Sequence, residues 1–209
     1  MNNFIITIGR QLGSGGRSVG HLLAEHYGIS LYDKSLINLA AEQSGISKQV
    51  FSQADEKVSR SFLRSLIPGR GMTMLGSNSP LSQDELFKVQ SDVIQNITEK
   101  ESCVILGRCA DYILRNHPRL ISIFLTADMD DRLKRLSEND NIPLEKALPV
   151  LEQGDKKRAS YYNYYTGGAW GVASTYHLSL NTSRLGIEGT TQFLIRYIDA
   201  RRAQWEEKE

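Results

Sequence analysis

Residues 4–18 read Phe4-Ile5-Ile6-Thr7-Ile8-Gly9-Arg10-Gln11-Leu12-Gly13-Ser14-Gly15-Gly16-Arg17-Ser18. The first five are apolar or β-branched and end at a glycine, which predicts a strand buried on both faces of a parallel sheet. After the glycine-rich turn, apolar residues recur at the spacing of one helical face as far as Tyr27, and Gly28 suits a C-terminal helix cap. A strand, a glycine loop and a helix in this order predict an α/β fold.

The rest of the chain repeats this alternation. Further short apolar runs predict strands at residues 29–32, 103–106, 121–125 and 177–180, with helical patterns between most of them. Apolar residues from Ile187 to Trp205 predict a long amphipathic helix that packs back on the sheet. Two stretches interrupt the alternation: residues 52–82, rich in Ser, Gly and Arg, and residues 155–176, which combine basic residues, tyrosines and a glycine pair. We interpret the first as an insertion in a single domain of residues 1–209 and the second as a closing flap or a surface loop.

Bulk composition limits the partners of this chain. Its 209 residues are 40% hydrophobic and 23% charged, as in one ordinary globular domain. Lys and Arg (25) nearly balance Asp and Glu (24), so no global field is available to hold a nucleic-acid backbone or an anionic membrane. The absence of a long apolar run or a signal-like N-terminus predicts a cytoplasmic protein. Cys103 and Cys109 are expected to be small buried side chains, not a disulfide or a zinc site.

The glycine-rich turn lies where open α/β sheets bind ligands, after a strand and before a helix. Glycines let successive N–H groups converge on phosphate oxygens, and the helix dipole adds positive potential. The Walker A pattern G-x-x-x-x-G-K-[ST] is met only in part, because Gln11 takes the first glycine position and Arg17 the lysine position. Arg17 has a permanent charge that can bridge phosphates, and the Ser18 hydroxyl could ligate Mg²⁺. The alternative is a glycine turn that binds nothing.

Several ordered segments resemble the cytidylate-kinase-like family, a branch of the nucleoside monophosphate kinases. They are residues 8–17, Leu31-Tyr32-Asp33-Lys34, Val104-Ile105-Leu106-Gly107-Arg108, Ile123-Phe124-Leu125-Thr126-Ala127 with Arg132, Asp155-Lys156-Lys157-Arg158-Ala159, and Asn181-Thr182-Ser183. The resemblance implies a three-layer P-loop kinase core with a five-stranded parallel sheet, an acceptor-binding insertion and a mobile lid. It also implies an ATP- and Mg²⁺-dependent phosphotransferase that acts on a nucleoside monophosphate, with CMP or dCMP first in line.

The resemblance also implies roles for individual residues. The ATP phosphates and the metal would be held by Gly13, Ser14, Gly15, Gly16, Arg17 and Ser18. The acceptor would be bound by Asp33, Arg108 and Asp155, with Arg158 stabilising charge on the transferring group. Each side chain also has a structural interpretation: a helix N-cap for Asp33, a surface ion pair for Arg108, and a solvated helix face for Asp155 and Arg158.

Departures from the family pattern leave alternatives open. The acidic neighbours that cytidylate kinases place around the arginine at position 108 are absent, and Leu151 replaces the first lid arginine. The chain could therefore be a kinase of another small phosphorylated metabolite on the same fold. It could also be a sensor module that binds ATP without transferring phosphate. The oligomeric state is not legible in the sequence.

Overall fold

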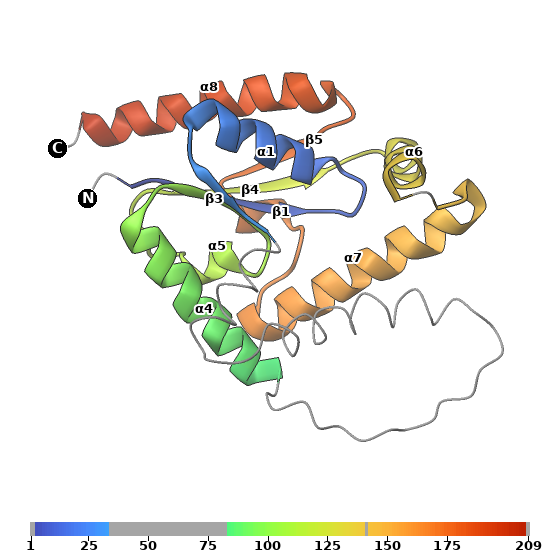
Figure 1. Ribbon diagram of the computed structural model, residues 1–209, viewed down its shortest axis with the longest axis horizontal. Helices are drawn as coiled ribbons and strands as arrows, with labels where there is room; N and C mark the ends of the chain where they lie inside the picture. The colour runs from blue at the N-terminus through green and yellow to red at the C-terminus, as the bar shows by residue number, and fades with distance from the viewer. Residues whose placement is uncertain (1–2, 34–82, 141, 208–209) are drawn as a thin grey trace. The chain divides into compact units, whose positions relative to one another are not determined.

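A computed structural model describes residues 3–33, 83–140 and 142–207, so the expected insertion at 52–82 lies outside the described residues. The chain forms two compact units, one made of residues 1–32 and 97–209 and the other of residues 33–96. The first unit contains the whole sheet and the glycine loop (Figure 1).

The sheet has the five parallel strands that the sequence predicts, with bounds that differ from the predicted ones by at most two residues. They are β1 (Ile5–Arg10), β2 (Ser30–Tyr32), β3 (Cys103–Leu106), β4 (Leu120–Thr126) and β5 (Leu178–Asn181), in the spatial order β2-β3-β1-β4-β5. Because β1 lies at the centre, the loop that follows it opens between the ends of β3 and β4. This is a switch point of the strand order, where α/β sheets bind ligands.

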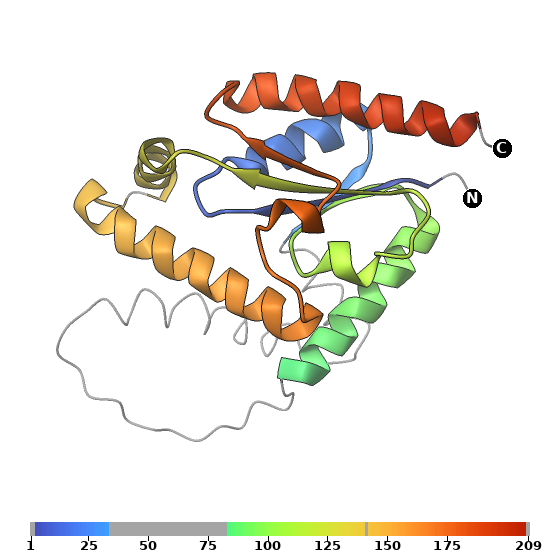
Figure 2. The same ribbon diagram turned by 180° about the vertical axis from the view of Figure 1, so that it is seen from behind.

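Helices cover both faces of the sheet. The long helices α1 (Gly16–Tyr27) and α8 (Gly186–Glu206) lie side by side on one face, and the short α5 (Ala110–Ile113) lies on the other (Figures 1 and 2). At the carboxyl ends of the strands, α6 (Met129–Asp140) packs against α7 (Leu144–Thr166). The remaining elements are α4 (Gln83–Lys100) and a 3₁₀ turn, η1 (Ala173–Thr175).

The main core lies between the sheet and the α1/α8 layer. Alternate strand residues such as Ile6 and Ile8 are fully buried there against Val19, Leu23 and the apolar face of α8. Gly20 lets α1 approach closely, since a Cβ there would lie 2.9 Å from a methyl group of the neighbouring β3 residue Leu106. Gly28 caps α1 in the left-handed conformation at φ 62°, as predicted.

The two cysteines are free and buried, as expected, and burial raises the pKa of both thiols to about 12. Only the thiolate reacts with disulfide reagents. We therefore expect an aromatic disulfide reagent at about pH 8 to label neither Cys103 nor Cys109 in the native protein and both after unfolding in guanidinium. Rapid labelling of the native protein would contradict the burial of these side chains.

Candidate functional site

The glycine loop between β1 and α1 makes its turn at two glycines in the left-handed conformation. Gly13 has φ 74° and Gly15, the N-cap of α1, has φ 77°. A Cβ on Gly13 would lie 2.6 Å from the Arg132 carbonyl oxygen, and one on Gly15 would collide with the Ile187 side chain. Backbone conformation and space both require glycine at these two positions. The predicted order of strand, glycine loop and helix is confirmed.

Side chains from distant segments bind the carbonyl oxygens of this loop. They come from α6, α7 and the residue after β5: Arg158 Nη1 to Arg10 O (3.0 Å), Arg132 Nε to Leu12 O (2.8 Å), Arg135 Nη1 to Gly13 O (3.2 Å) and Thr182 Oγ1 to Ser14 O (2.7 Å). Two further carbonyls are bonded within the segment, Gln11 O by Ser14 N and Gly15 O by Val19 N. The carbonyl oxygens of residues 10–15 are therefore all hydrogen-bonded within the protein.

Several N–H groups of the loop, unlike its carbonyl oxygens, are not hydrogen-bonded. Within the described ranges, no acceptor is found for the N–H groups of Gly13, Gly15 and Gly16. The first N–H groups of a helix have no intrahelical partner and lie at its positive end. The Ser14 side chain is completely buried, and its Oγ also lacks a hydrogen-bond partner among the described residues. Free amides and a buried hydroxyl at a helix N-terminus fit the oxygen atoms of a phosphate.

A buried ion pair clamps the loop to α6 and α7. Asp155 accepts a hydrogen bond from Leu12 N (2.7 Å) with one carboxylate oxygen and pairs with Arg132 through the other. Arg132 in turn donates to the Leu12 carbonyl, so the pair binds both backbone polar groups of one loop residue. The sequence suggested that Asp155 contacts the acceptor. In this structure its two oxygens hold the loop, and the acceptor contact stays a prediction.

The end of β3 carries an unusual turn. Gly107, Arg108 and Cys109 have φ values of 70°, 58° and 56°, three successive left-handed residues of which two are not glycine. Each non-glycine residue in this conformation costs about 1–2 kcal/mol, and such strain concentrates at ligand sites. The turn is joined to β1 by a hydrogen bond from Gly107 N to Ile8 O (3.1 Å). Arg108 is thus placed directly beside the strand that leads into the loop.

Arg10, the last residue of β1, links the loop to this turn. A Cβ added to Gly16 would lie 2.8 Å from Arg10 Cβ, and one added to Gly107 would collide with Arg10 Nη1. The Arg10 side chain therefore runs from the first residue of α1 to the Gly107 turn. Its position in the Walker pattern gave no reason to select it from the sequence.

The segment expected to form the lid, residues 155–176, is helical as far as Thr166, where Gly167 ends α7 with φ 64°. Near this end Tyr162 donates a hydrogen bond to Asp111 (2.7 Å), the acidic residue three positions after Arg108. Desolvation raises the pKa of Asp111 and of Tyr162.

The Tyr176 ring packs on Phe124, and Trp170 lies edge-on to the same ring. These aromatic contacts and the Tyr162 bond therefore join residues 155–176 to β4 and α5. The closing motion of residues 155–176 stays a prediction.

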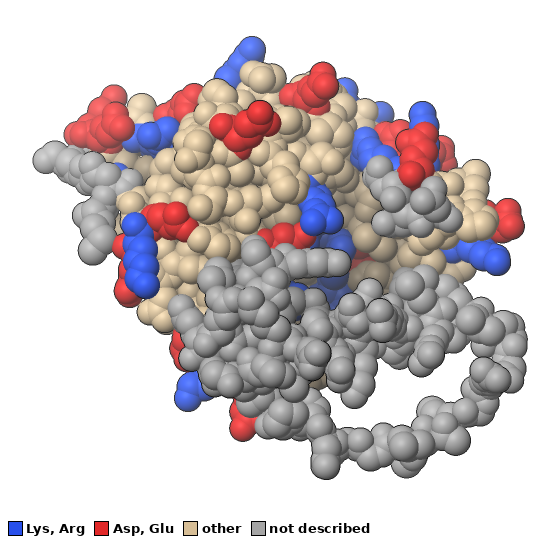
Figure 3. All heavy atoms as spheres, viewed as in Figure 1, with Lys and Arg blue, Asp and Glu red and all other residues tan. Residues whose placement is uncertain are grey.

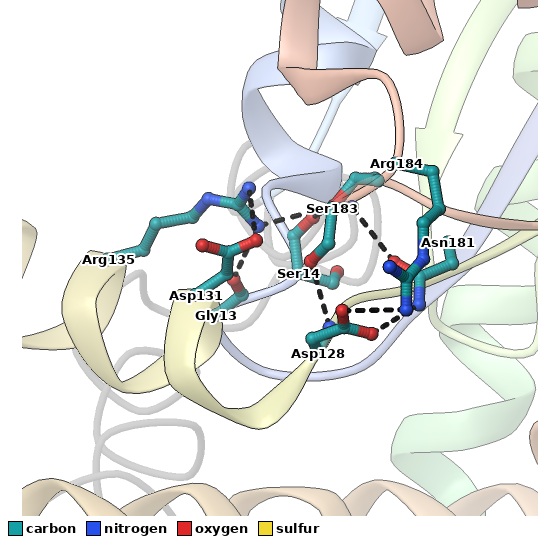
Figure 4. Close-up of polar contacts among 9 residues, drawn as sticks. Gly13, Ser14, Asp128, Asp131, Arg135, Asn181, Ser183 and Arg184 are labelled. Atoms are coloured by element: carbon teal, nitrogen blue, oxygen red, sulfur yellow. Dashed lines mark hydrogen bonds and ion pairs between the residues drawn. The ribbon is translucent and has the colours of Figure 1, made fainter.

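A second polar cluster surrounds the other side of the loop (Figure 4). Asp128, at the end of β4, accepts from Asn181 Nδ2 (2.7 Å) and pairs with Arg184 (3.0 Å), and its N–H donates to Ser183 Oγ (2.9 Å). These bonds join the ends of β4 and β5 next to Ser14. The segment Asn181-Thr182-Ser183, singled out by resemblance, therefore lies against the loop.

The remaining expected residues are less enclosed. Arg17 and Ser18, the second and third residues of α1, are exposed, and basic side chains gather beside the N-terminal end of α1 in Figure 3. Asp33 follows β2 directly and is the first residue of the second unit. The described residues contain no group of three acidic, His or Cys side chains for a metal. Mg²⁺ in kinases takes one or two protein ligands plus substrate phosphates, so this donor set fits it only together with a nucleotide.

No helix in the described part of the chain is long and apolar enough to cross a membrane.

Comparisons with known proteins give the family and the fold. The model of the cytidylate kinase-like family matches residues 5–184. A cytidylate kinase of Methanopyrus kandleri is 25% identical over 204 residues, covering 93% of each chain. An uncharacterized protein from Eubacterium ventriosum has a solved structure with a TM-score of 0.69 and 30% identity, covering 94% of this chain and 99% of that one. A shikimate kinase from Bacteroides thetaiotaomicron shares the fold, with a TM-score of 0.54, 16% identity and coverage of 94% and 98%.

The clamp on Leu12 predicts a large cost for one substitution. Asp155→Ala leaves the Arg132 guanidinium, whose side chain is 6% exposed, buried without its partner, which costs about 3 kcal/mol of unfolding free energy. The control Asp131→Ala removes an exposed pair with Arg135 at 3.9 Å and should cost less than about 1 kcal/mol. Urea unfolding measures both changes, and equal effects would contradict the clamp.

The buried carboxyl of Asp111 predicts a pH dependence. Because folding raises its pKa above the ordinary 3.8, protonation favours the folded state, and this contribution is lost as pH rises through the folded pKa. Asn at this position cannot ionise and keeps an oxygen that accepts from Tyr162. The stability of Asp111→Asn relative to wild type should therefore increase as pH rises. Urea unfolding at a series of pH values tests this, and a constant difference would refute it.

Proposed function

This chain belongs to the cytidylate kinase-like family, and from that premise we propose that it transfers the γ-phosphate of ATP to a nucleoside monophosphate, with CMP or dCMP as the first candidates. Family and fold together identify a phosphotransferase of the nucleotide and small-metabolite kinase type. One observation supports the proposal most strongly: the loop carbonyls are bonded within the protein, whereas the N–H groups of Gly13, Gly15 and Gly16 and the buried Ser14 hydroxyl find no partner among the described residues.

The donor phosphates are proposed to bind at residues 13–18. The N–H groups of the loop and the positive end of α1 would bind phosphate oxygens, with the Ser14 hydroxyl as a further donor. Arg17 and Ser18 would act from the first turn of α1, Arg17 on the phosphates and Ser18 on Mg²⁺. Mg²⁺ when bound would neutralise phosphate charge. The protein would supply donors that are already in position.

The acceptor phosphate is proposed to bind Arg108, whose guanidinium can bind two oxygens at once. An acceptor oxygen would attack the γ-phosphorus as the bond to the β,γ-bridging oxygen breaks, releasing ADP. Arg158 is held next to the loop by its bond to Arg10 O and would stabilise charge on the transferring group. Asp33 and Asp155 are also proposed to contact the acceptor. The proposal for Asp33 is based on its place in the sequence directly after β2.

Leu151 favours a second class of acceptor, small phosphorylated metabolites other than nucleotides. Leu151, which takes the place of the first lid arginine, is completely buried in α7 and contributes to packing, not to anion binding. A site with one acceptor cation fewer would suit a small phosphorylated metabolite as well as CMP. A non-catalytic ATP sensor is the remaining alternative, and its support is the incomplete Walker pattern.

An ADP-release assay across all common nucleoside monophosphates and several phosphorylated metabolites tests the proposal. We expect turnover with CMP or dCMP. Arg108→Ala should lower kcat/KM for the acceptor about 30- to 1000-fold, the equivalent of about 2–4 kcal/mol, because the acceptor phosphate loses a charge-assisted fork. The KM for ATP should change little.

Arg115→Ala is the matched control, since Arg115 lies beyond α5, stacks on Tyr112 and bonds its carbonyl. It should leave turnover unchanged. Turnover with a non-nucleotide acceptor alone would replace the substrate class and keep the mechanism. ATP binding without ADP release for any acceptor would support the sensor alternative.

A further inference from the structure

The backbone of the loop decides how the Walker pattern aligns with this sequence. With Gly16 as its second glycine, the pattern puts its lysine at Arg17, as the sequence suggested. With Gly15 in that role, the first glycine position is Arg10, the lysine position is Gly16 and the Ser/Thr position is Arg17, with Ser18 one residue further on. Gly15 has the left-handed φ of 77° that requires glycine, whereas Gly16 is helical. The structure therefore favours the second alignment over the one expected from the sequence.

In this alignment, the glycine and the cation of the pattern have exchanged places. Position 16 has no side chain, and position 10 has a guanidinium. The two positions touch: a Cβ on Gly16 would lie 2.8 Å from Arg10 Cβ and 3.1 Å from Arg10 Cγ. A lysine at position 16 would collide with the Arg10 stem, so the arginine at position 10 requires a glycine at position 16.

Building on the proposed function, we propose that Arg10 is the main phosphate-binding cation of the loop, ahead of the exposed Arg17, and that it takes the place of the lysine that its own stem excludes from position 16. Its stem lies over Gly16, the first residue of α1, whose N–H has no acceptor within the described ranges. The buried Ser14 Oγ, without a partner in the described part of the chain, lies 3.5 Å from the place of a Gly16 Cβ. Amides, hydroxyl and the Arg10 stem therefore meet at one point of the loop.

The reach of Arg10 also suggests where its charge acts. Its Nη1 lies against Gly107, the residue before Arg108, so the guanidinium is placed between the donor loop and the acceptor arginine. Its backbone is fixed by the bond from Arg158 to Arg10 O. A planar guanidinium can bind oxygens of two phosphates, which a compact ammonium does less well. Arg10 should therefore affect turnover as well as ATP affinity.

The test uses the full chain and four variants. Arg10→Met keeps the stem that packs on Gly16 and removes the charge. Arg10→Lys restores a charge, Arg17→Ala removes the exposed neighbour, and Arg10→Gly with Gly16→Lys exchanges the two positions back. Calorimetry measures the binding of Mg-ATP and of inorganic tripolyphosphate, which has no base or sugar. The ADP-release assay gives kcat, and thermal unfolding checks that each variant folds.

We expect Arg10→Met to weaken the binding of both probes about 100-fold and to lower kcat, because a charge-assisted bond to phosphate is lost. Arg10→Lys and the exchanged double variant should recover at least about tenfold of the affinity, and Arg17→Ala should lose less than about tenfold. Wild-type affinity in Arg10→Met, with a large loss in Arg17→Ala, would overturn the inference. If the inference about Arg10 fails in this way but the wild-type protein phosphorylates an acceptor, the proposed function is still supported. A wild type that binds neither probe would overturn both.

Discussion

The site depends on one constraint: the carbonyl oxygens of the loop after β1 must be bound from outside. A peptide loop carries about as many C=O acceptors as N–H donors. It attracts an anion when the protein binds its C=O groups and leaves N–H groups unbound, and it repels an anion in the reverse case. Here three arginines and a threonine bind four of the five carbonyls of residues 10–14, and Ser14 N binds the fifth, that of Gln11. Among the described residues, the N–H groups of Gly13, Gly15 and Gly16 have no acceptor. Bound carbonyls beside unbound N–H groups are the arrangement that an anion-binding loop requires.

The donors come from residues 132–182, so the carboxyl-terminal half of the chain shapes a loop near its start. Asp155 and Arg158, about one helical turn apart on α7, bind Leu12 N and Arg10 O. A rigid-body motion of this part of α7 would break both bonds and disturb the phosphate loop. Any closing motion of residues 155–176 that preserves these two bonds must therefore leave residues 155–158 of α7 in place.

The sequence predicted the elements because each one has a local signature: β-branched runs for the strands, Gly28 for the end of α1, and apolar spacing for α8. It could not predict the contacts that make the site. Two successive left-handed residues at Arg108 and Cys109 have no sequence signature, since neither residue type favours that conformation. Arg135 is 122 residues away from the carbonyl it binds, and such pairings are set only by the packed fold.

The alignment of the Walker pattern with the loop is also a feature that the sequence alone does not decide. A pattern specifies which position in the chain carries a charge, whereas a phosphate responds to where the charge lies in space. Positions 10 and 16 are six residues apart in sequence and in contact in the structure, so a cation can enter the same region from either one. The backbone amides, the helix dipole and the outward-bound carbonyls are unaffected by that choice. Loss of the lysine from the pattern therefore does not by itself imply loss of phosphate binding.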